Sequence, residues 1–477
     1  MPRPLPAAFP LRANLLPRLY EESRRSGWVS PEAVGSIARD LRLPLAEAWE
    51  VATSFADFSF QAPMPAEQRC GWLACRTAGS DAQGHCQFRC YDAPASAPEC
   101  PFPAQMVRLA GPLLAPEHAA GQALAAVREM GRDRALATIA EAGLRGRGGA
   151  YFPTGAKWQN ALAENRPVAL VVNAEEGEPG VFKDRALLSV APQRVAEGIA
   201  IAAFVLQPAV LVLFVNGHAD PMAESLSAAL AGWPLDVEPV LVRGGGGYVL
   251  GEEGALLNAI EGRRPVPRTR PPFPAQSGLF GMPTIVNNVE TLANLPIIFS
   301  DPDAFRTSGE SNSPGTRILS VSGRVERPGV YEVPLGTSLR ELIGRSGPVV
   351  SGAPAVLMGG PSGGFLAATA LDVPLSPGLM HPTGAMLGAG GVTVLDAPGD
   401  IREAALMAAA FNASESCGKC TPCREGTPRL LDALSAGDTA AIADLGEVLQ
   451  FASLCGLGQM APGPVRSALH FWPEVFA

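Results

Sequence analysis

Near its C-terminal end the chain reads Glu415-Ser-Cys-Gly-Lys-Cys-Thr-Pro-Cys-Arg-Glu-Gly426, which places three cysteines at C-x2-C-x2-C spacing. Three thiolates at this spacing can bind three iron corners of one cubane from a single loop, and a distant fourth cysteine can bind the last corner. Zinc sites more often bring their cysteines as two C-x2-C pairs. The motif therefore predicts a [4Fe–4S] cluster, with zinc or unrelated buried thiols as the alternatives. The predicted ligands are Cys417, Cys420, Cys423 and Cys455.

The residues around this motif divide into a helical end and a small α+β unit. From about Asp400 the apolar pattern is helical to the C-terminus. The preceding segment alternates at Arg317–Gly323 and again at Val330–Val333, around an Arg-Pro-Gly turn, which predicts a hairpin. Leu339–Ile343 predicts a short helix. Residues 296–315 are expected to be a linker that ends in a Ser/Gly/Asn/Pro cluster.

Residues 144–295 alternate glycine-rich loops with apolar strands and helices, which predicts an α/β layer domain. Val168–Asn173 and Val210–Val215 have the pattern of buried strands. The most apolar run, Ile199–Val215, is too short to span a bilayer and is interrupted by Gln-Pro. It therefore predicts a buried helix, a turn and a strand.

The N-terminal part combines helices with a cysteine-rich segment. Residues 1–60 have a helical pattern, in which Ser30 is a helix N-cap with proline at the first helical position. Leu45–Phe55 predicts a later helix. Residues 61–105 hold several prolines and five cysteines and are expected to form loops around a site. The five are Cys70, Cys75, Cys86, Cys90 and Cys100, and no role follows for Cys100.

The composition limits the classes of function. A chain of 477 residues is long enough for about three to four domains, and 47 % hydrophobic residues can bury a large core. The formal charge of −9 disfavours nucleic acid as a partner, because a polyanion would be repelled. The N-terminal Met-Pro-Arg-Pro-Leu lacks the apolar segment of a signal peptide. We therefore expect no membrane span and a cytoplasmic location, where clustered cysteines bind metal more often than they form disulfides.

Glycine-rich and acidic loops indicate a nucleotide site in the central domain. Leu144–Ala150 packs three glycines into four positions, which lets backbone amides face a phosphate, although a plain turn is the alternative. The acidic loop Asn173–Gly180 follows a strand, and its three carboxylates are costly unless they bind a ligand; a solvated turn is the alternative. Further glycine, acidic, basic and amide residues follow in Gly244–Glu253, Glu261–Arg264, Arg270–Pro274 and Asn287–Thr291. Together these runs fit a flavin mononucleotide (FMN) and a dinucleotide lying side by side.

With the cysteine motif, these residues resemble the flavoprotein subunit shared by respiratory complex I, NAD-reducing hydrogenases and NAD-dependent formate dehydrogenases. The resemblance covers about residues 130–477, and its runs occur in one order. They are Leu144–Ala150, Phe152–Gly155, Lys157-Trp158, Phe182–Arg185, Gly251–Glu253, Glu261–Arg264, Pro271–Pro274, Asn287–Thr291 and Glu415–Gly426.

The resemblance implies a multidomain α/β fold. It assigns residues 1–105 to a helical and shortened thioredoxin-like ferredoxin domain, and 106–310 to an α/β FMN- and NAD-binding domain. It assigns 311–395 to a ubiquitin-like β-grasp (SLBB-like) domain, and 396–477 to a helical bundle with the [4Fe–4S] cluster. The implied cofactors are FMN, [4Fe–4S] and NAD, and no catalytic residue is expected beyond them. The implied contacts to FMN and NAD(H) are Gly146, Arg147, Gly148, Gly149, Phe152, Lys157, Asn173, Glu175, Glu176, Glu178, Tyr248, Gly251, Glu252, Glu253, Phe273, Asn287 and Asn288.

The N-terminal segment resembles a second family, the thioredoxin-like [2Fe–2S] subunit that partners this flavoprotein. Cys70-x4-Cys75 and Cys86-x3-Cys90 match the local spacings of its four ligands. Only ten residues separate the two pairs, where the family has a longer strand–helix segment. We expect the four cysteines to hold a [2Fe–2S] cluster, with a remnant domain as the alternative.

Several positions depart from the family pattern and bear on NAD. Tyr151 stands where the family has glycine, Glu175 replaces aspartate, and Asn160 replaces an aromatic residue. Arg270 replaces lysine, and Asn216–Ala219 replaces an Arg-Gly-Glu-Tyr run. The flavin site is therefore expected to be kept, whereas an electron-transfer subunit that has lost NAD binding is the alternative.

The short fused N-terminal segment and the run Cys455–Gln459 most resemble the β subunit of formate dehydrogenase. This predicts a diaphorase subunit that links NAD(H), FMN and the cluster to a molybdenum or tungsten catalytic subunit. A complex I or hydrogenase subunit is the alternative, and a separate small ferredoxin-like subunit is a further candidate partner. The histidines are scattered and are expected at the surface or in packing; they are His85, His118, His218, His381 and His470.

Overall fold

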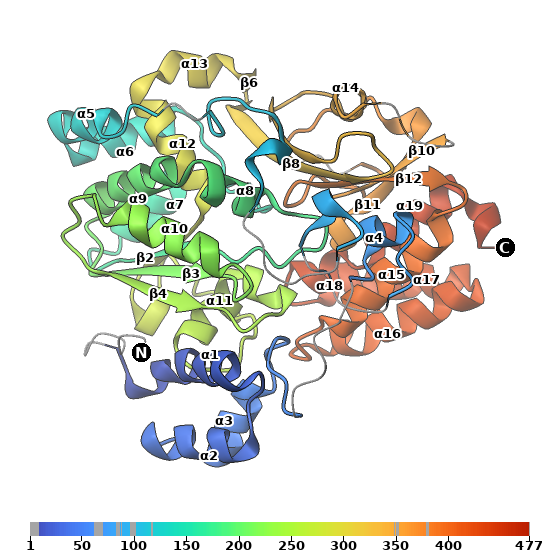
Figure 1. The fold of residues 1–477 in the computed structure, drawn as a ribbon, viewed down its shortest axis with the longest axis horizontal. Helices are drawn as coiled ribbons and strands as arrows, with labels where there is room; N and C mark the ends of the chain where they lie inside the picture. Colours follow the sequence, from blue (N-terminus) through green and yellow to red (C-terminus); the bar gives the residue numbers. More distant parts are fainter. Residues whose placement is uncertain are drawn as a thin grey trace.

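The computed structural model describes residues 9–61, 70–82, 86, 88–95, 102–115, 118–347, 349, 353–377 and 381–476. A parallel sheet with its helices and a mixed sheet lie side by side, and the C-terminal helices pack next to the mixed sheet (Figure 1).

The central unit is a four-stranded parallel sheet in the order β4-β3-β2-β5. Its strands are β2 (Ala169–Ala174), β3 (Val210–Val215), β4 (Pro239–Arg243) and β5 (Thr284–Asn288). Because successive side chains of a strand point to opposite faces, β2 and β3 contribute to two separate cores. Helices α9 (Pro192–Leu206) and α12 (Val289–Ser300) cover one of the faces. The carboxyl ends of all four strands meet at one edge, where such sheets bind ligands.

The other helices of this unit surround the sheet. They are α5 (Gln122–Met130), α6 (Arg132–Glu141), α7 (Thr154–Leu162), α8 (Lys183–Val190), α10 (Asp220–Leu230) and α11 (Glu253–Ile260). The apolar run was predicted correctly, because α9 ends at Leu206, Gln207 takes a φ of 45° and β3 begins at Val210. Within the described ranges no single helix has the length and apolar composition to cross a membrane, while α8 and α9 together, bent by 95°, pass that test by length and composition.

The second unit is a six-stranded mixed sheet in the order β1-β9-β8-β12-β10-β11. Its strands are β1 (Val107–Leu109), β8 (Thr316–Gly323), β9 (Gly329–Pro334), β10 (Ala353–Met358), β11 (Gly364–Ala367) and β12 (Gly391–Ala397). The predicted hairpin is confirmed as the antiparallel pair β8 and β9, and the predicted short helix is α14 (Leu339–Arg345). β1 pairs with β9 in parallel, although it falls in the range assigned to the nucleotide-binding domain. The chain therefore contributes to the mixed sheet before it enters the parallel one.

The predicted linker at residues 296–315 was wrong, because most of it is regular structure. It contains the end of α12, helix α13 (Pro302–Thr307) and the short antiparallel pair β6 (Gly309–Glu310) and β7 (Ser313–Pro314). Asp301 caps α13 by accepting a hydrogen bond from Ala304 N–H at 2.9 Å. The polar sequence hid these elements, since caps and turns use the same residue types as linkers.

The C-terminal residues form helices, as predicted. They are α15 (Ile401–Ser414), α16 (Thr421–Ala436), α17 (Thr439–Ala452), α18 (Gly456–Met460) and α19 (Pro462–Phe471). Helix α15 packs on α16 and α19, and α19 also packs on β11. The bundle is thus continuous with the mixed sheet.

The N-terminal helices cover the second face of the parallel sheet (Figure 1). They are α1 (Leu15–Ser26), α2 (Pro31–Asp40) and α3 (Leu45–Ala52). Ser30 caps α2 as predicted, since its Oγ accepts a hydrogen bond from Ala33 N–H at 3.1 Å. Helix α3 ends three residues before the predicted Phe55. Because α1 to α3 share a core with β2, β3 and β4, they belong to the parallel-sheet unit.

The cysteine-rich segment packs elsewhere, against the mixed sheet. In the part of residues 70–95 that the structure describes there is one α-helix, α4 (Leu73–Thr77), and no strand. A thioredoxin-like domain is built on a sheet, so these residues do not show that architecture. Helix α4 contacts β8 and β12. Cys100 and His85 lie outside the described residues.

Candidate functional site

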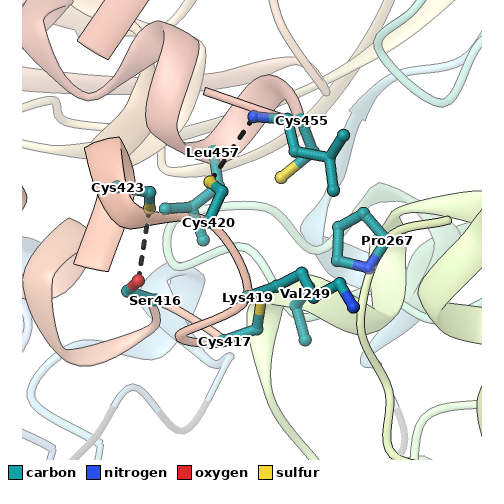
Figure 2. Close-up of a pocket in the computed structure, with 10 residues that line it drawn as sticks. Val249, Pro267, Ser416, Cys417, Lys419, Cys420, Cys423, Cys455 and Leu457 are labelled. Atoms are coloured by element: carbon teal, nitrogen blue, oxygen red, sulfur yellow. Dashed lines mark hydrogen bonds between the residues drawn. The ribbon is translucent and has the colours of Figure 1, made fainter. Parts of the chain in front are cut away.

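The four C-terminal cysteines surround one pocket (Figure 2). Cys417 and Cys420 lie on the loop between α15 and α16, and Cys423 lies in the first turn of α16. Cys455 directly precedes α18. Apolar side chains complete the lining, from Val249, Pro267, Leu454 and Leu457. Four thiols around an apolar pocket are the donor set of a [4Fe–4S] cluster.

Hydrogen bonds from the chain hold these thiols. Ser416 Oγ lies 3.2 Å from Cys423 Sγ, and Leu454 N–H donates to Cys420 Sγ at 3.5 Å. Hydrogen bonds to sulfur are one of the means by which a protein sets the potential of an iron–sulfur cluster. The predicted ligand set therefore comes with the groups that tune it.

The charge of the pocket also fits a cluster. Burial raises the pKa of the Cys455 thiol to about 12, so its thiolate form needs a cation such as iron beside it. Arg264 Nη2 donates to Cys417 O at 2.7 Å and adds positive charge at the rim.

The glycine loop Leu144–Ala150 lies at the carboxyl edge of the parallel sheet. Arg147 N–H donates to Thr291 Oγ1 at 2.8 Å, which holds the loop to the start of α12. A Cβ atom at Gly148 would lie 3.3 Å from Asn288 Cβ, so the loop runs close against the end of β5. Gly148 is exposed, and its backbone is therefore open to a ligand.

The acidic loop after β2 is buried although it carries three carboxylates. The exposed fractions of Glu175, Glu176 and Glu178 are 8, 5 and 8 %. Burial raises the pKa of Glu175 and that of Glu178 to about 8. Glu175 Oε2 has no hydrogen-bond partner among the described residues. An orphaned buried acceptor is costly, and a ligand that donates a hydrogen bond would relieve that cost.

Two predicted cofactor contacts use their side chains for the fold instead. Glu176 accepts hydrogen bonds from Asp184 N–H at 2.7 Å and from Arg185 Nη1 at 3.0 Å, at the start of α8. The Arg147 guanidinium is fully buried and donates to Pro314 O at 2.9 Å. The sequence could not separate these residues from their neighbours, because their partners lie in other segments.

A chain of charges crosses the same edge of the sheet. Lys157 Nζ donates to Glu253 Oε2 at 2.8 Å and to Val286 O at 2.9 Å. Arg270 Nη2 lies 2.6 Å from Glu252 Oε1 and 3.0 Å from Glu253 Oε1. Burial alone would raise the pKa of Glu253, but Lys157 and Arg270 lower it below its usual value. Arg270 thus supplies a cation at the position where the family has lysine.

The structure brings most other predicted contacts to this edge. Tyr248 Oη donates to Glu178 Oε1 at 3.2 Å, and Asn287 Oδ1 accepts from Trp158 Nε1 at 2.8 Å. Phe152 and Phe273 are 53 and 52 % exposed, which leaves two aromatic rings free to stack on a ligand. The remaining predicted contacts lie on the segments that end β2 and precede α7 and α11; they are Gly146, Gly149, Asn173 and Gly251.

Sequence reasoning missed a buried charge network beneath the site. Lys183, Asp184 and Glu290 are 1, 4 and 0 % exposed. Lys183 Nζ lies 2.6 Å from Asp184 Oδ1 and 2.9 Å from Glu290 Oε2. Asn288 Nδ2 donates to Asp184 Oδ2 at 2.6 Å, so the network orients a predicted flavin contact. The matching run Phe182–Arg185 was the available signal, because it puts three charges into an apolar helix.

Tyr151, which raised doubt about the NAD site, points away from it. The residue has a φ of 55° and its side chain is buried in the core of the mixed sheet. Tyr151 Oη donates to Gly388 O at 2.8 Å, and Arg317 Cζ lies 4.9 Å from the ring centre. The tyrosine therefore ties the glycine loop to the mixed sheet and leaves the edge of the parallel sheet open. Asn160 is exposed on α7.

The run Asn216–Ala219 also has a structural explanation. Asn216 Nδ2 donates to Glu175 Oε1 at 2.6 Å, so the residue that replaces arginine positions an acidic side chain of the site. His218 Nε2 lies 2.8 Å from Asp57 Oδ1 of the N-terminal segment. The other described histidines contact residues outside the site: His118 pairs with Glu197, His381 contacts Thr383 and His470 packs on Phe471.

The four N-terminal cysteines of the predicted [2Fe–2S] site come together in one thiol cluster. Cys86 Sγ and Cys90 Sγ are 3.8 Å apart, and Cys70 hydrogen-bonds both Cys75 and Cys86. Cys70, Cys75 and Cys90 are no more than 2 % exposed. Ala95 N–H donates to Cys75 Sγ at 3.3 Å.

This thiol cluster touches the acidic loop through one aromatic residue. Phe88 lies between two of the cysteines, and its ring centre lies 4.3 Å from Arg185 Cζ. Arg185 in turn pairs with Glu176 at 3.0 Å. The N-terminal cysteines and the carboxyl edge of the parallel sheet are therefore joined by two side-chain contacts.

Known protein families match the same segments that form this site. The Nuo51 FMN-binding domain matches residues 139–297, the SLBB domain matches 318–366, and the NADH-ubiquinone oxidoreductase-F iron–sulfur binding region matches 403–477. An NADH-quinone oxidoreductase subunit of Mycobacterium tuberculosis is 40 % identical over 386 residues, which cover 75 % of this chain and 87 % of that protein. The chain belongs to this family of NADH-oxidising flavoprotein subunits. Its family membership establishes FMN and [4Fe–4S] as cofactors and NADH as the substrate.

The family extends to hydrogenases. The NADP-reducing hydrogenase subunit HndC of Solidesulfovibrio fructosivorans is 38 % identical over 376 residues, covering 73 % of this chain and 76 % of that protein. A chain in the crystal structure of an NAD+-reducing [NiFe]-hydrogenase superposes with a TM-score of 0.86 at 29 % identity. That match covers 98 % of this chain and 93 % of the other, so its fold also has a counterpart for the N-terminal segment.

Proposed function

We propose that the carboxyl edge of the parallel sheet binds FMN and NAD(H) together and passes electrons to a [4Fe–4S] cluster at the C-terminal cysteines. One segment carries the proposal, because Tyr248 and Val249 are neighbours that face different sites. Tyr248 hydrogen-bonds Glu178 of the acidic loop, whereas Val249 lines the pocket of the four thiols. Two consecutive residues thus contact the nucleotide edge and the cluster pocket, respectively.

The residues divide the work by chemistry. The amides of the glycine loop and Lys157 face anionic phosphate, and Glu175 and Glu178 accept hydrogen bonds from ribose or amide groups. The exposed rings of Phe152 and Phe273 would stack on the nicotinamide or adenine base. Bound FMN supplies the conversion between two-electron hydride transfer and one-electron transfer. The chain would orient the nucleotides, and no side chain has to act as a general acid or base.

Anaerobic optical titration of the purified full-length chain tests this function. NADH is expected to bleach the flavin band of an FMN-loaded sample. A sample that binds FMN and is bleached by dithionite, but not by NADH, would support the alternative of a chain that has lost NAD binding. Failure to bind FMN at all would contradict the proposal.

For the complete enzyme we propose a molybdenum- or tungsten-dependent formate dehydrogenase, in which this chain is the β subunit. The support is the resemblance of Cys455–Gln459 and of the short N-terminal segment to that subunit. A hydrogenase is the second candidate, favoured by the structural match over 98 % of the chain. A cytoplasmic location stays a prediction from the sequence.

Copurification decides between these partners. A tagged chain isolated from its native cells is expected to bring a large subunit with molybdenum or tungsten and NAD-dependent formate oxidation. Nickel with hydrogen-dependent NAD reduction would identify the hydrogenase assembly instead. Metal analysis and the two activity assays on the same preparation distinguish the outcomes.

A further inference from the structure

The N-terminal segment reaches the nucleotide edge directly after α3. Asp57 N–H donates to Gly245 O at 2.8 Å, which pairs the two backbones. A Cβ atom at Gly245 would lie 2.8 Å from Phe55 Cγ. One at Gly246, where φ is 77°, would collide with the Asp57 carboxylate. Gly245 and Gly246 are therefore required by the contact with Phe55 and Asp57, and not by backbone turning alone.

The Asp57 side chain also meets the acidic loop. Its Oδ1 lies 2.8 Å from His218 Nε2. The unpartnered Oε2 of Glu175 faces the same loop, since a Cβ atom at Gly244 would lie 2.5 Å from it. Asp57, His218 and Glu175 thus surround the start of the glycine loop Gly244–Gly247.

The far end of this glycine loop leads to both cofactor sites. Tyr248, the next residue, hydrogen-bonds Glu178 through its hydroxyl. Its N–H donates to Glu415 Oε2 at 2.8 Å, and Glu415 lies two residues before the cluster ligand Cys417. Any displacement of the loop would therefore move residues at the flavin edge and at the cluster pocket.

We propose that Asp57 is a positioning residue of the flavin site, which holds the Gly244–Gly247 loop in place and adds, with His218 as its counter-charge, to the negative charge beside Glu175. The inference rests on the proposed function of the parallel-sheet edge. On this proposal the N-terminal segment contributes a residue to the flavin site, in addition to the cysteines of the predicted [2Fe–2S] site. FMN affinity and the ionisation of the site are both expected to depend on Asp57 and His218.

The charges around Glu175 give the sign of the pH effect. Burial raises the pKa of Glu175 most, the Asp57 carboxylate raises it further, and Asn216, Arg185 and His218 lower it. In a His218→Gln variant the Asp57 charge is no longer compensated. The pKa of Glu175 then rises, and the carboxylate forms at higher pH than in the wild type.

The first test is a suppressor experiment on the full-length chain, with the FMN dissociation constant measured by the fluorescence of released flavin. Gly247 also has positive φ, but a Cβ there meets nothing within 4 Å. Gly247→Ala is therefore the matched control and should weaken FMN binding about tenfold through backbone strain alone. Gly246→Ala adds the collision and should weaken binding about a hundredfold. Asp57→Ala should weaken FMN binding about tenfold further in the Gly247→Ala background, because the loop loses its contact with Asp57, and should not weaken it further in the Gly246→Ala background, where the collision has already displaced Asp57.

The second test is the pH dependence of the flavin spectrum, which a purely structural role would not move. His218→Gln is expected to shift the midpoint near pH 8 upward, whereas Asp40→Asn, which removes the exposed pair with Arg18, leaves it in place. Equal effects of Asp57→Ala on both glycine variants, with an unmoved midpoint in His218→Gln, would overturn the inference. Absence of FMN from the wild-type chain would instead contradict the proposed function.

Discussion

The two cysteine sets are built from the same ligand type but in opposite ways. The C-terminal thiols lie on the loop before α16, in its first turn and directly before α18, around an apolar pocket whose wall includes Val249 of the flavin edge. The N-terminal thiols hydrogen-bond one another in a closed cluster and reach the flavin edge through Phe88 and Arg185. The spacing of cysteines in the sequence predicts which of them bind iron. The side chains that surround each cysteine set then determine which set lies close enough to the flavin site to receive its electrons.

Replacing one C-terminal ligand should have the largest effect. Cys423→Ser removes a thiolate that no neighbour can supply, so the cubane signal in electron paramagnetic resonance should vanish while NADH still bleaches the flavin. Ser416→Ala is the matched control, because it removes only the hydroxyl 3.2 Å from Cys423 Sγ. It should keep the cluster and lower its potential modestly. A full cubane signal in Cys423→Ser would contradict the assignment of Cys423 as a cluster ligand.

Replacing one N-terminal ligand should affect only the N-terminal set. Cys86→Ser is expected to remove the [2Fe–2S] signal and to leave the FMN content, the cubane signal and NADH oxidation with an artificial acceptor within about twofold of the wild type. Iron analysis and paramagnetic resonance of the same sample check this. Loss of flavin reduction by NADH in this variant would place the N-terminal cysteines on the main route.

The acidic loop after β2 predicts a pH dependence of NADH binding. Burial raises the pKa of Glu178 to about 8, so the group is neutral below that pH and becomes a carboxylate above it. The KM for NADH should therefore rise, by about tenfold or less, as pH passes from 7 to 9, because the new negative charge meets an anionic nucleotide. Glu178→Gln should flatten this rise. A KM that climbs equally in both proteins would assign the effect to another group.

Tyr151 offers the smallest expected effect. Tyr151→Phe loses the hydrogen bond to Gly388 O and should lower the free energy of unfolding by about 1 kcal/mol. The KM for NADH should not change, since the ring is buried in the mixed-sheet core. A large change in the KM for NADH without a change in thermal stability would show that Tyr151 contributes to the nucleotide site instead.

Local sequence signals predicted the elements that depend on short-range chemistry. The C-x2-C-x2-C spacing, the Ser30 cap and the break after Leu206 each involve at most seven consecutive residues, and the structure agrees with all three. The partners of Tyr151 and Asn216 lie far away in the sequence, so their substitutions could be misread as damage to the NAD site. The position of the N-terminal helices could also not be predicted from the sequence, because it depends on which face of β2 and β3 the other helices leave uncovered.

The most direct test of the relay is anaerobic reduction of the FMN-loaded chain with NADH, followed on one sample by visible absorbance and electron paramagnetic resonance. The account predicts loss of the flavin band together with a cubane-type signal that disappears in Cys455→Ser. Flavin bleaching with no cubane signal in the wild type, from a sample that contains four iron atoms at this site, would contradict a route from the flavin edge through Tyr248 and Val249 to the C-terminal cysteines.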